Sequence, residues 1–344
     1  MITIQDNFDL SSHNTFGMKV KCSLYLEYDK ASDLEQIDFA SLPKPVMHIG
    51  SGSNLLFTSD FGGTVLHSAI DYIKYIDMGL KEVPVAVGAG VEFDRFVRNV
   101  CDNGLWGAEN LSLIPGEVGA AAVQNIGAYG VEVKDIISGV VCYDIIGKKK
   151  VTFKAGECGY GYRTSRFKES PDKGRYIITS VLFRLGRNPQ PHLEYKGLTA
   201  ALGTSEPASP QLVRDAIIKI RREKLPDPAE TGSAGSFFKN PVVPVARFLE
   251  IIEIARKEKG EGYTVPHYDV GMGMIKIPAA WMIEQCGFKG LKMGNAAVYE
   301  KQPLVLVNAT GKASPQEIIA LEQAIIDAVS AKFGVTLHPE VEHI

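Results

Sequence analysis

The segment from Leu113 to Gly130 constrains this chain most, because almost half of its residues have little or no side chain. It contains four glycines and four alanines among eighteen residues. Such a segment fills a conventional core poorly, but it leaves room for a flat, planar cofactor to lie against the backbone. Gly116 also leads into a short helix whose first N–H groups suit a phosphate. The alternative is a tightly packed helix of small residues without a ligand.

A second segment of small residues lies at positions 232–242. Small residues from Gly232 to Gly235 allow a ligand to approach the backbone, and Ser236 follows them with a hydroxyl group. Lys239 and Asn240 then add a cation and an amide. This combination suits chemistry on a small anionic substrate. The alternative is a glycine turn that enters a buried strand.

A glycine turn is expected at residues 50–54, between short strands at 46–49 and 55–57. Successive backbone N–H groups in such a turn form a concave site that binds anions. The turn is not a Rossmann dinucleotide fingerprint, because that pattern requires glycine where this chain has Leu55. The alternative is a tight hairpin that joins the two strands.

Two charged residues outside these segments are candidates for a site. Arg163 follows two tyrosines in Tyr160-Gly-Tyr-Arg163, and its guanidinium suits bidentate binding of a carboxylate. Its alternative is a surface salt bridge. Glu340 is a lone acid near the C-terminus, and its alternative is a solvated charge.

Composition excludes several classes of function. A length of 344 residues predicts about two or three domains. The net charge of −3 provides no bulk attraction to nucleic acid or anionic membrane. The five cysteines are scattered and the seven histidines have no ligand spacing, so we expect neither disulfides nor a metal site. Without a signal pattern or a membrane-length apolar run, we expect a cytoplasmic protein.

Periodicity predicts a chain of mixed helices and strands. Further strands are expected where β-branched residues gather, at 83–87, 136–146, 151–153 and 176–185. Helices are expected at 93–100, 210–222, 245–257 and 279–286. A last helix follows Ser314, which forms a capping box with Glu317, and ends before Gly334. The fold class predicted is therefore α+β.

Taken in order, these segments closely resemble UDP-N-acetylenolpyruvoylglucosamine reductase, also called UDP-N-acetylmuramate dehydrogenase, a flavoenzyme family of bacterial peptidoglycan precursor synthesis. The segments that carry the resemblance span nearly the whole chain: 14–17, 50–54, 114–130, 159–163, 224–228, 235–241, 280–285 and 339–341. Each one alone is weak, whereas the ordered set is highly specific.

The resemblance implies an FAD-binding unit of the vanillyl-alcohol-oxidase (PCMH) type, made of two α+β subdomains at 1–75 and 76–208. A substrate-binding α+β domain at 209–344 would follow. FAD would be non-covalent, because residues 50–54 contain no histidine that could bond it. The residues implied in FAD binding are Gly50, Ser51, Gly52, Ser53, Asn54, Ile114, Pro115, Gly116, Gly119, Ala120, Asn125 and Gly127.

The resemblance also implies a reaction in which NADPH reduces FAD and UDP-N-acetylglucosamine enolpyruvate is then reduced to UDP-N-acetylmuramate. Hydride would pass from flavin N5 to the substrate. Arg163 and Glu340 would stabilise the enolic intermediate, and Ser236 would protonate it as general acid. The residues implied in binding the UDP-sugar are Tyr195, Lys224, Asn240 and Gln302. Tyr195 belongs to the long form of the family, in which its loop closes over the nucleotide.

One departure and two alternatives accompany this hypothesis. Related sequences often carry a basic residue soon after the matching glutamate, whereas Glu340 is followed by Val341 and Glu342. The first alternative is an oxidase of the same flavin fold that uses oxygen. The second is a non-catalytic protein that binds a UDP-sugar or a flavin. The sequence leaves the oligomeric state open, with a monomer as one option.

Overall fold

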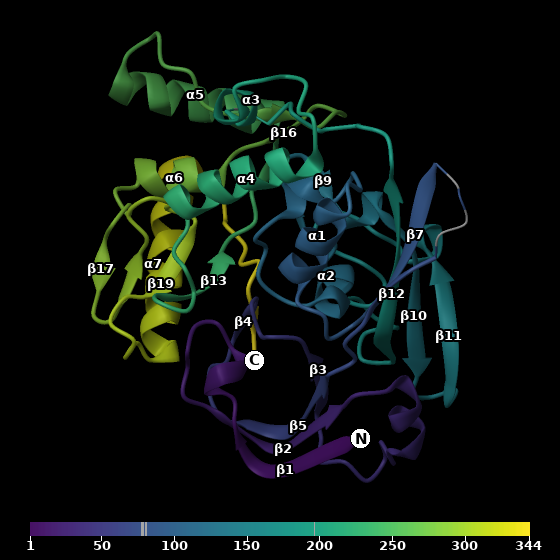
Figure 1. Ribbon diagram of the computed structural model, residues 1–344. Coiled ribbons are helices and arrows are strands. Elements are labelled where there is room, and N and C mark those ends of the chain that lie inside the picture. Colours follow the sequence, from purple (N-terminus) through teal and green to yellow (C-terminus); the bar gives the residue numbers. More distant parts are fainter. Residues whose placement is uncertain (77–78, 80, 196) are drawn as a thin grey trace. The chain divides into compact units, whose positions relative to one another are not determined.

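The computed structural model describes residues 1–76, 79, 81–195 and 197–344, which form two compact units (Figure 1). Unit 1 comprises Met1–Leu10, Lys21–Gly52 and Asp60–Glu223. Unit 2 comprises Ser11–Val20, Ser53–Ser59 and Lys224–Ile344. Both units mix helices and strands. The three-domain division with boundaries at 75 and 208 stays a prediction.

The first sheet of unit 1 has the strand order β1-β2-β5-β3. Its strands are β1 (Ile2–Asp9), β2 (Lys21–Tyr28), β3 (Val46–Ile49) and β5 (Phe61–Ser68). Strands β2 and β3 both run parallel to β5, whereas β1 is antiparallel to β2. The parallel pairing directs the C-terminal end of β3 into Gly50.

The hairpin alternative for residues 50–54 is wrong. Strand β3 pairs with β5, and β4 (Leu55–Leu56) instead pairs in parallel with β20 (Glu342–His343), near the C-terminus. Since the two flanking strands do not pair with one another, the turn is not a hairpin loop. It contributes Gly50, Ser51 and Gly52 to unit 1 and the next two residues to unit 2.

The second sheet of unit 1 is antiparallel, with the order β11-β10-β12-β7-β6. Its strands are β6 (Ile73–Tyr75), β7 (Glu82–Gly88), β10 (Ile137–Asp144), β11 (Lys149–Lys154) and β12 (Tyr176–Gly186). Helices α1 (Phe93–Asp102) and α2 (Val118–Gln124) lie beside this sheet (Figure 1). Together they enclose a large hydrophobic core, where the rings of Phe96 and Phe183 stack with centroids 4.3 Å apart.

The two helices form for different local reasons. Phe93, Phe96, Val97 and Val100 recur at helical spacing, and all four are fully buried on one face of α1. Helix α2 has only seven residues, and it ends at Asn125, which adopts the left-handed conformation with φ 47°.

The remaining elements of unit 1 are short, apart from α4. They are η2 (Ala31–Gln36), η3 (Glu109–Leu111), β8 (Gly127–Ala128), β9 (Val131–Glu132), η4 (Val133–Asp135), η5 (Ala155–Glu157), α3 (Leu198–Leu202) and α4 (Pro210–Lys224). Helix α4 ends at Lys224, where unit 2 resumes.

Unit 2 contains two further antiparallel sheets, ordered β13-β19-β18-β17 and β14-β16-β15. Its strands, besides β4 and β20, are β13 (Gly232–Ser236), β14 (Val242–Pro244), β15 (Tyr268–Asp269), β16 (Met274–Lys276), β17 (Lys292–Met293), β18 (Ala296–Val298) and β19 (Val305–Asn308). Its helices are η1 (Ser11–His13), α5 (Val245–Lys259), α6 (Ala279–Gln285) and α7 (Pro315–Phe333).

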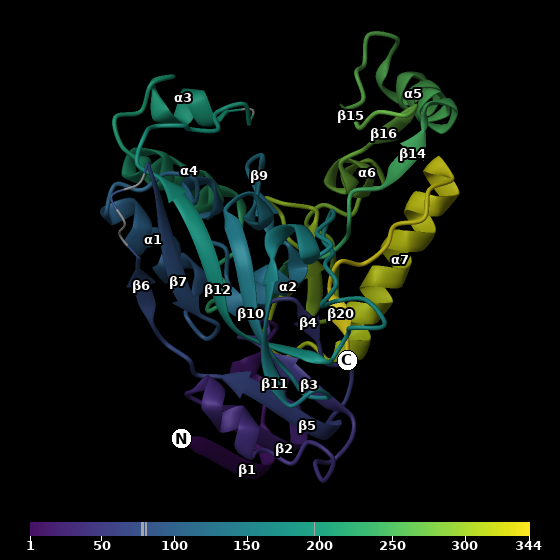
Figure 2. The same ribbon diagram turned by 90° about the vertical axis from the view of Figure 1, so that its right-hand side faces the viewer.

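Helix α7 organises the helical part of unit 2 (Figure 2). Ser314 caps its first turn in a reciprocal capping box with Glu317, as the sequence predicts, and Gly334 ends it with φ 62°. At its C-terminal end, Lys332 Nζ donates to the carbonyl of Gln285 at 2.8 Å in α6. The same lysine pairs with Glu258 of α5 at 2.7 Å, which fastens both helices to α7.

Every strand and helix range predicted above is present, with ends that differ by at most two residues. Among the described residues, no helix is long and apolar enough to cross a membrane. The five cysteines are free thiols, of which only Cys286 is not fully buried.

Candidate functional site

In unit 1, the glycine turn and helix α2 approach each other at the backbone. A Cβ atom placed on Gly50 would lie 3.2 Å from the Cβ of Ala120 and 3.2 Å from Oε2 of Glu117. Both distances are tighter than ordinary contacts, so the position suits glycine. Gly52 adopts φ 67°, which is also a glycine conformation. Backbone rather than bulky side chains therefore forms this surface.

Packing explains part of the small-residue segment without a ligand. Gly119 is buried in α2, and a Cβ atom there would lie 2.9 Å from the Cβ of Ala89. The tightly packed small-residue helix is therefore present, and Gly119 serves its packing. Ala120, on the side toward Gly50, stays partly exposed.

The loop that carries Ile114, Pro115 and Gly116 is anchored by a buried ion pair. Both guanidinium nitrogens of Arg214 donate to the Asp94 carboxylate, at 2.6 and 2.7 Å, and the backbone N–H of Leu113 donates to the same group. Burial opposes the charge on Asp94, but the hydrogen bonds from Arg214 and Leu113 outweigh it and lower its pKa. The carbonyl of Gly116 accepts from Phe93 N at 2.9 Å.

Arg163 is held by the end of the same segment. Its Nη2 donates to the carbonyl of Gly127 at 2.9 Å, and its Nη1 reaches the carbonyl of Asn125 at 3.4 Å. A Cβ atom on Gly127 would lie 2.8 Å from the carbonyl oxygen of Val131 and 3.2 Å from Nη1, so the position suits glycine. Arg163 itself has φ 57°, an uncommon conformation for a residue with a side chain, and such outliers gather at functional sites.

Asn125 serves this arrangement with its own side chain. It is fully buried, and its Nδ2 donates to the carbonyl of Gly161 at 2.8 Å and to Glu132 at 3.0 Å. Its Oδ1 accepts from the backbone N–H of Lys134 at 3.1 Å. The amide thus joins the loop that carries Arg163 to residues 132–134.

Tyr195 lies beside a residue pair that the sequence did not indicate. Its ring packs edge-to-face against Tyr129, with centroids 4.7 Å apart. Tyr129 in turn interacts with the side chain of Arg221 on α4. Burial lowers the pKa of Arg221, although the Tyr129 side chain and the Asp94 charge oppose that shift. A cation and two phenols therefore gather in unit 1.

In unit 2, Ser236 and Glu340 are brought together through the backbone. Ser236 is the exposed last residue of β13, and the carbonyl of Phe237 accepts from the backbone N–H of Glu340 at 2.8 Å. Glu340 is partly buried, and its backbone belongs to the folded core of unit 2 rather than to a solvated tail. A buried ring, Phe237, fixes the chain between them.

The glycines before Ser236 have separate structural reasons. A Cβ atom on Gly232 would lie 2.4 Å from the carbonyl oxygen of Phe16, so no side chain fits there. Gly235 adopts φ 71° where the pairing of β13 with β19 shifts register. The segment is itself a strand, rather than a turn that precedes one.

The other predicted residues of unit 2 lie on neighbouring segments. Asn54 donates from Nδ2 to the carbonyl of Glu340 at 3.1 Å, and Ser53 precedes it. Gln302 lies in the turn between β18 and β19, two residues before Leu304, whose carbonyl accepts from Phe237 N.

Asn240 bonds the N-terminal end of α6, and Lys224 is the C-terminal residue of α4. The Oδ1 of Asn240 accepts from the backbone N–H of Ala279, the first residue of α6, at 2.9 Å. This bond orients the amide nitrogen, a donor that suits anionic oxygens. Lys224 is exposed at the end of α4.

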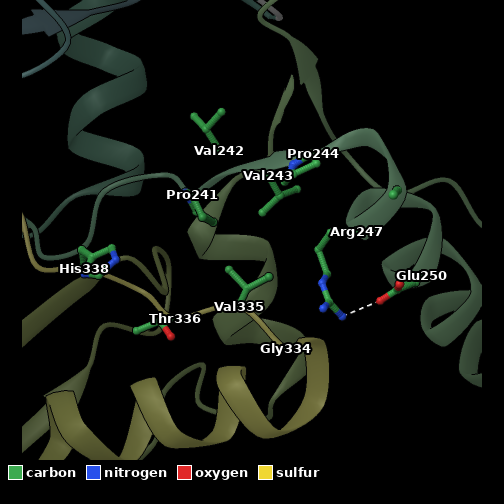
Figure 3. Close-up of a pocket in the computed structure, with 11 residues that line it drawn as sticks. Pro241, Val242, Val243, Pro244, Arg247, Glu250, Gly334, Val335, Thr336 and His338 are labelled. Atoms are coloured by element: carbon green, nitrogen blue, oxygen red, sulfur yellow. Dashed lines mark hydrogen bonds and ion pairs between the residues drawn. The ribbon is translucent and has the colours of Figure 1, made fainter. Parts of the chain in front are cut away.

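A cavity of about 570 Å³ lies in unit 2, directly after Asn240 along the chain (Figure 3). Strand β14 and helix α5 line one side, and residues Gly334 to His338 line the other. Arg247 and Glu250 form an ion pair at its wall. None of the predicted site residues lines this cavity, so it does not carry the chemistry proposed below.

The residues of unit 1 fit a flat cofactor. At Gly50 and Ala120 the surface consists of backbone and a single methyl group. Arg163 donates to the carbonyl of Gly127, three residues after the end of α2. A planar ring system requires an approach of this kind. Among the described residues, no cluster of His, Cys, Asp and Glu could hold a metal ion.

Two family models match parts of the chain. The model described as UDP-N-acetylenolpyruvoylglucosamine reductase, C-terminal domain, matches residues 227–344, and an FAD binding domain matches residues 37–148. A protein of Bacteroides fragilis (strain YCH46), named UDP-N-acetylenolpyruvoylglucosamine reductase, is 45% identical over 342 residues, covering 99% of this chain and 100% of the relative. A Porphyromonas gingivalis (strain ATCC 33277) protein of the same name is 43% identical over 345 residues, covering 99% of both chains.

A solved structure shares the fold. The crystal structure of UDP-N-acetylenolpyruvylglucosamine reductase from Thermus caldophilus superposes with a TM-score of 0.66 at 21% identity, covering 100% of this chain and 98% of that chain. Together with the FAD binding domain at 37–148, this likeness confirms the predicted fold class.

Proposed function

Because the chain belongs to the UDP-N-acetylenolpyruvoylglucosamine reductase family, FAD-dependent oxidoreductases, we propose that it reduces UDP-N-acetylglucosamine enolpyruvate to UDP-N-acetylmuramate with electrons from NADPH. The observation that carries the proposal is the hydrogen bond from the backbone N–H of Glu340 to the carbonyl of Phe237, the residue after Ser236, in a chain that matches its relatives over nearly their whole length. A site in the cytoplasm, where NADPH and nucleotide sugars are made, is part of the proposal.

Bound FAD would supply hydride transfer, from NADPH and then from N5 to the β-carbon of the enolpyruvyl ether. The electron pair of the broken double bond then moves to the α-carbon and its carboxylate. Arg163 would stabilise this developing charge, since its guanidinium is oriented in advance by two carbonyl oxygens. Glu340 would act with Arg163 to stabilise this enolic intermediate.

Ser236 would complete the reaction by donating its hydroxyl proton to the α-carbon. A serine hydroxyl is a weak acid, so it protonates only a strongly basic, carbanion-like centre. Its place at the exposed end of β13 supports this role, because the hydroxyl is accessible while the strand fixes its position. Solvent would return a proton to the serine oxygen.

The diphosphate of the substrate would be bound by Lys224, Asn240, Tyr195 and Gln302. The cation, the amide donor and the phenol are all groups that donate to phosphate oxygens. In unit 1, Tyr195 packs against Tyr129, which in turn interacts with Arg221.

FAD would bind non-covalently along residues 50–54 and 114–127, within the first two of the three domains divided at 75 and 208. The match of an FAD binding domain supports FAD, and the absence of histidine from the turn supports the non-covalent mode. Acid denaturation followed by filtration should release the yellow chromophore. Colour that stays with the precipitate would overturn the non-covalent mode.

The proposed reaction is tested by anaerobic stopped-flow spectroscopy in two steps. NADPH should bleach the flavin absorbance, and UDP-N-acetylglucosamine enolpyruvate should then restore it without oxygen. If NADPH leaves the flavin oxidised, the reductant is wrong. If only oxygen restores the colour, the protein is an oxidase, and if neither step occurs it is a binding protein.

A further inference from the structure

Three titratable side chains, Glu27, His67 and Glu117, are joined by hydrogen bonds next to the glycine turn at residues 50–52 of unit 1. His67, on β5, has a carboxylate oxygen at each ring nitrogen. Nδ1 lies 2.8 Å from Oε2 of Glu27, and Nε2 lies 2.9 Å from Oε1 of Glu117. The side chains of His67 and Glu117 are only 15% and 12% exposed to solvent. Polar groups this enclosed must satisfy one another.

This geometry requires a proton on both nitrogens of His67 when both glutamates are ionised. Neutral imidazole has a single N–H group, so it can donate to only one of two carboxylates. Burial opposes the charge, but the bonds and charges of Glu117 and Glu27 outweigh it and raise the pKa of His67. Burial also raises the pKa of Glu117, although His67 opposes that shift.

Two other titratable groups around His67, Tyr25 and His48, have hydrogen-bond partners of their own. Tyr25 stacks against its ring at 6.3 Å and donates its hydroxyl to Glu27 at 2.9 Å. On β3, burial and the charge of His67 lower the pKa of His48 to about 3, so that ring is neutral near neutral pH. His48 hydrogen-bonds instead with Tyr28, at 2.7 Å.

The second oxygen of Glu117 points at the glycine turn. A Cβ atom on Gly50 would lie 3.2 Å from Oε2 of Glu117, whose Oε1 meets His67. Glu117 is also the residue from which α2 starts. In the sheet, His67 pairs directly with Ile49, the last residue before Gly50. The His67 side chain and backbone therefore link both segments that the proposed function assigns to the cofactor, one through Glu117 and the other through the pairing with Ile49.

We propose that His67 is a positioning residue for the flavin site, which acts through Glu117 to hold the Gly50 turn and the start of α2 in register. The proposal rests on the proposed function only in that these two segments bind FAD. His67 itself need not touch the cofactor. The chemistry of the substrate plays no part in it.

The test measures FAD dissociation constants on the apoprotein by quenching of flavin fluorescence. His67→Gln and Glu117→Gln should each weaken FAD binding at least about tenfold, as expected from losing a charge-assisted hydrogen bond. Glu27→Gln should have a smaller effect, because Glu27 holds the ring from the far side. Tyr28→Phe is the matched control, since it removes a hydrogen bond of the same sheet but keeps the hydrogen bonds between His67 and its two glutamates, and its dissociation constant should stay within about twofold.

The pH dependence supplies a readout that a merely structural role would not change. Because folding raises the pKa of His67, its stabilisation is complete below the unfolded value of 6.5 and is lost as pH rises through the folded value. The FAD affinity and the apoprotein Tm of the wild type should therefore fall with rising pH in that interval. In His67→Gln this decline in FAD affinity should be absent.

The outcomes separate cleanly. If His67→Gln and Glu117→Gln lower the apoprotein Tm but leave the FAD dissociation constant and its pH dependence unchanged, His67 is structural and the proposal is overturned. If His67→Gln does not fold, the dissociation constant of Glu117→Gln decides alone. Failure of the reduction of UDP-N-acetylglucosamine enolpyruvate with normal, His67-dependent FAD binding would overturn the proposed function and leave this inference standing.

Discussion

Unit 1 and unit 2 position their candidate residues by different means. In unit 1, Arg163 and Asn125 both adopt left-handed backbone conformations, and side-chain bonds to carbonyl groups keep them there. In unit 2, Ser236 ends strand β13 and Glu340 lies at a bend, and backbone hydrogen bonds hold the two segments. Removing the Ser236 side chain should therefore leave the backbone of unit 2 in place. Removing the Asn125 side chain should disturb the loops of unit 1, because that side chain helps to hold them. The predictions below test this contrast.

Ser236→Ala should have the largest effect on activity, and it should affect only one of the two half-reactions. Reoxidation of the flavin by the enolpyruvyl substrate should fall roughly 10²–10⁴-fold, the range for loss of a general acid. NADPH reduction of the flavin and the Tm should both stay near wild type, because backbone bonds hold β13. Stopped-flow absorbance measures the two half-reactions. Equal loss of both would show that the hydroxyl binds or supports structure, and a wild-type rate would assign the proton to another donor.

Arg163→Lys should slow the same half-reaction by roughly 10²–10³-fold, as for loss of an aligned donor to a developing oxyanion. Lysine keeps the charge but cannot reach the carbonyls of Asn125 and Gly127 together. Arg166→Lys is the control, since Arg166 pairs with Asp172 at 2.6 Å instead. A single-turnover assay at saturating substrate measures the effect. Full activity in Arg163→Lys would mean that charge alone suffices.

Asn125→Ala should lower stability, because unit 1 relies on this side chain. It removes the hydrogen bonds to the part-buried carbonyl of Gly161 and to the backbone N–H of Lys134, which costs about 1–3 kcal/mol in the free energy of unfolding. Alanine also fits the left-handed conformation less well than asparagine. Urea unfolding of the apoprotein measures the change. In unit 2, Ser236→Ala should change it by less than about 0.5 kcal/mol. Equal losses in both variants would break the contrast between the units.

Lys224→Ala should have the smallest effect, a rise in KM for the UDP-sugar of about tenfold with kcat nearly unchanged. Lys224 is exposed at the end of α4, so its removal disturbs neither unit. Lys219→Ala, an exposed lysine on the same helix, is the control and should keep the wild-type KM. Steady-state kinetics with varied UDP-sugar measure both. A wild-type KM in Lys224→Ala would remove this lysine from substrate binding.

Local patterns in the sequence were enough to predict many of the helices and strands and to single out the candidate site segments. Helix α7, with Ser314 and Gly334 at its ends, follows from residues close to one another in the chain. The same is true of α1, whose apolar residues recur at helical spacing. By contrast, β1 was not predicted, although Ile2, Ile4 and Phe8 alternate with polar residues; most of its side chains are exposed, so burial does not reinforce that pattern. Its partner β2 was not predicted either, and pairing with β1 and β5 places it in the sheet.

The sequence by itself determined which residue types stand in which segments, and with them the resemblance that names the family. Only the tertiary structure decided that β3 and β4 pair with different strands, and that His67 lies between Glu27 and Glu117, 40 and 50 positions away. The left-handed backbone at Arg163 was likewise invisible, since arginine has no preference for it. The reason is physical: periodicity reports whether a side chain is buried, while its partner depends on pairing between distant strands.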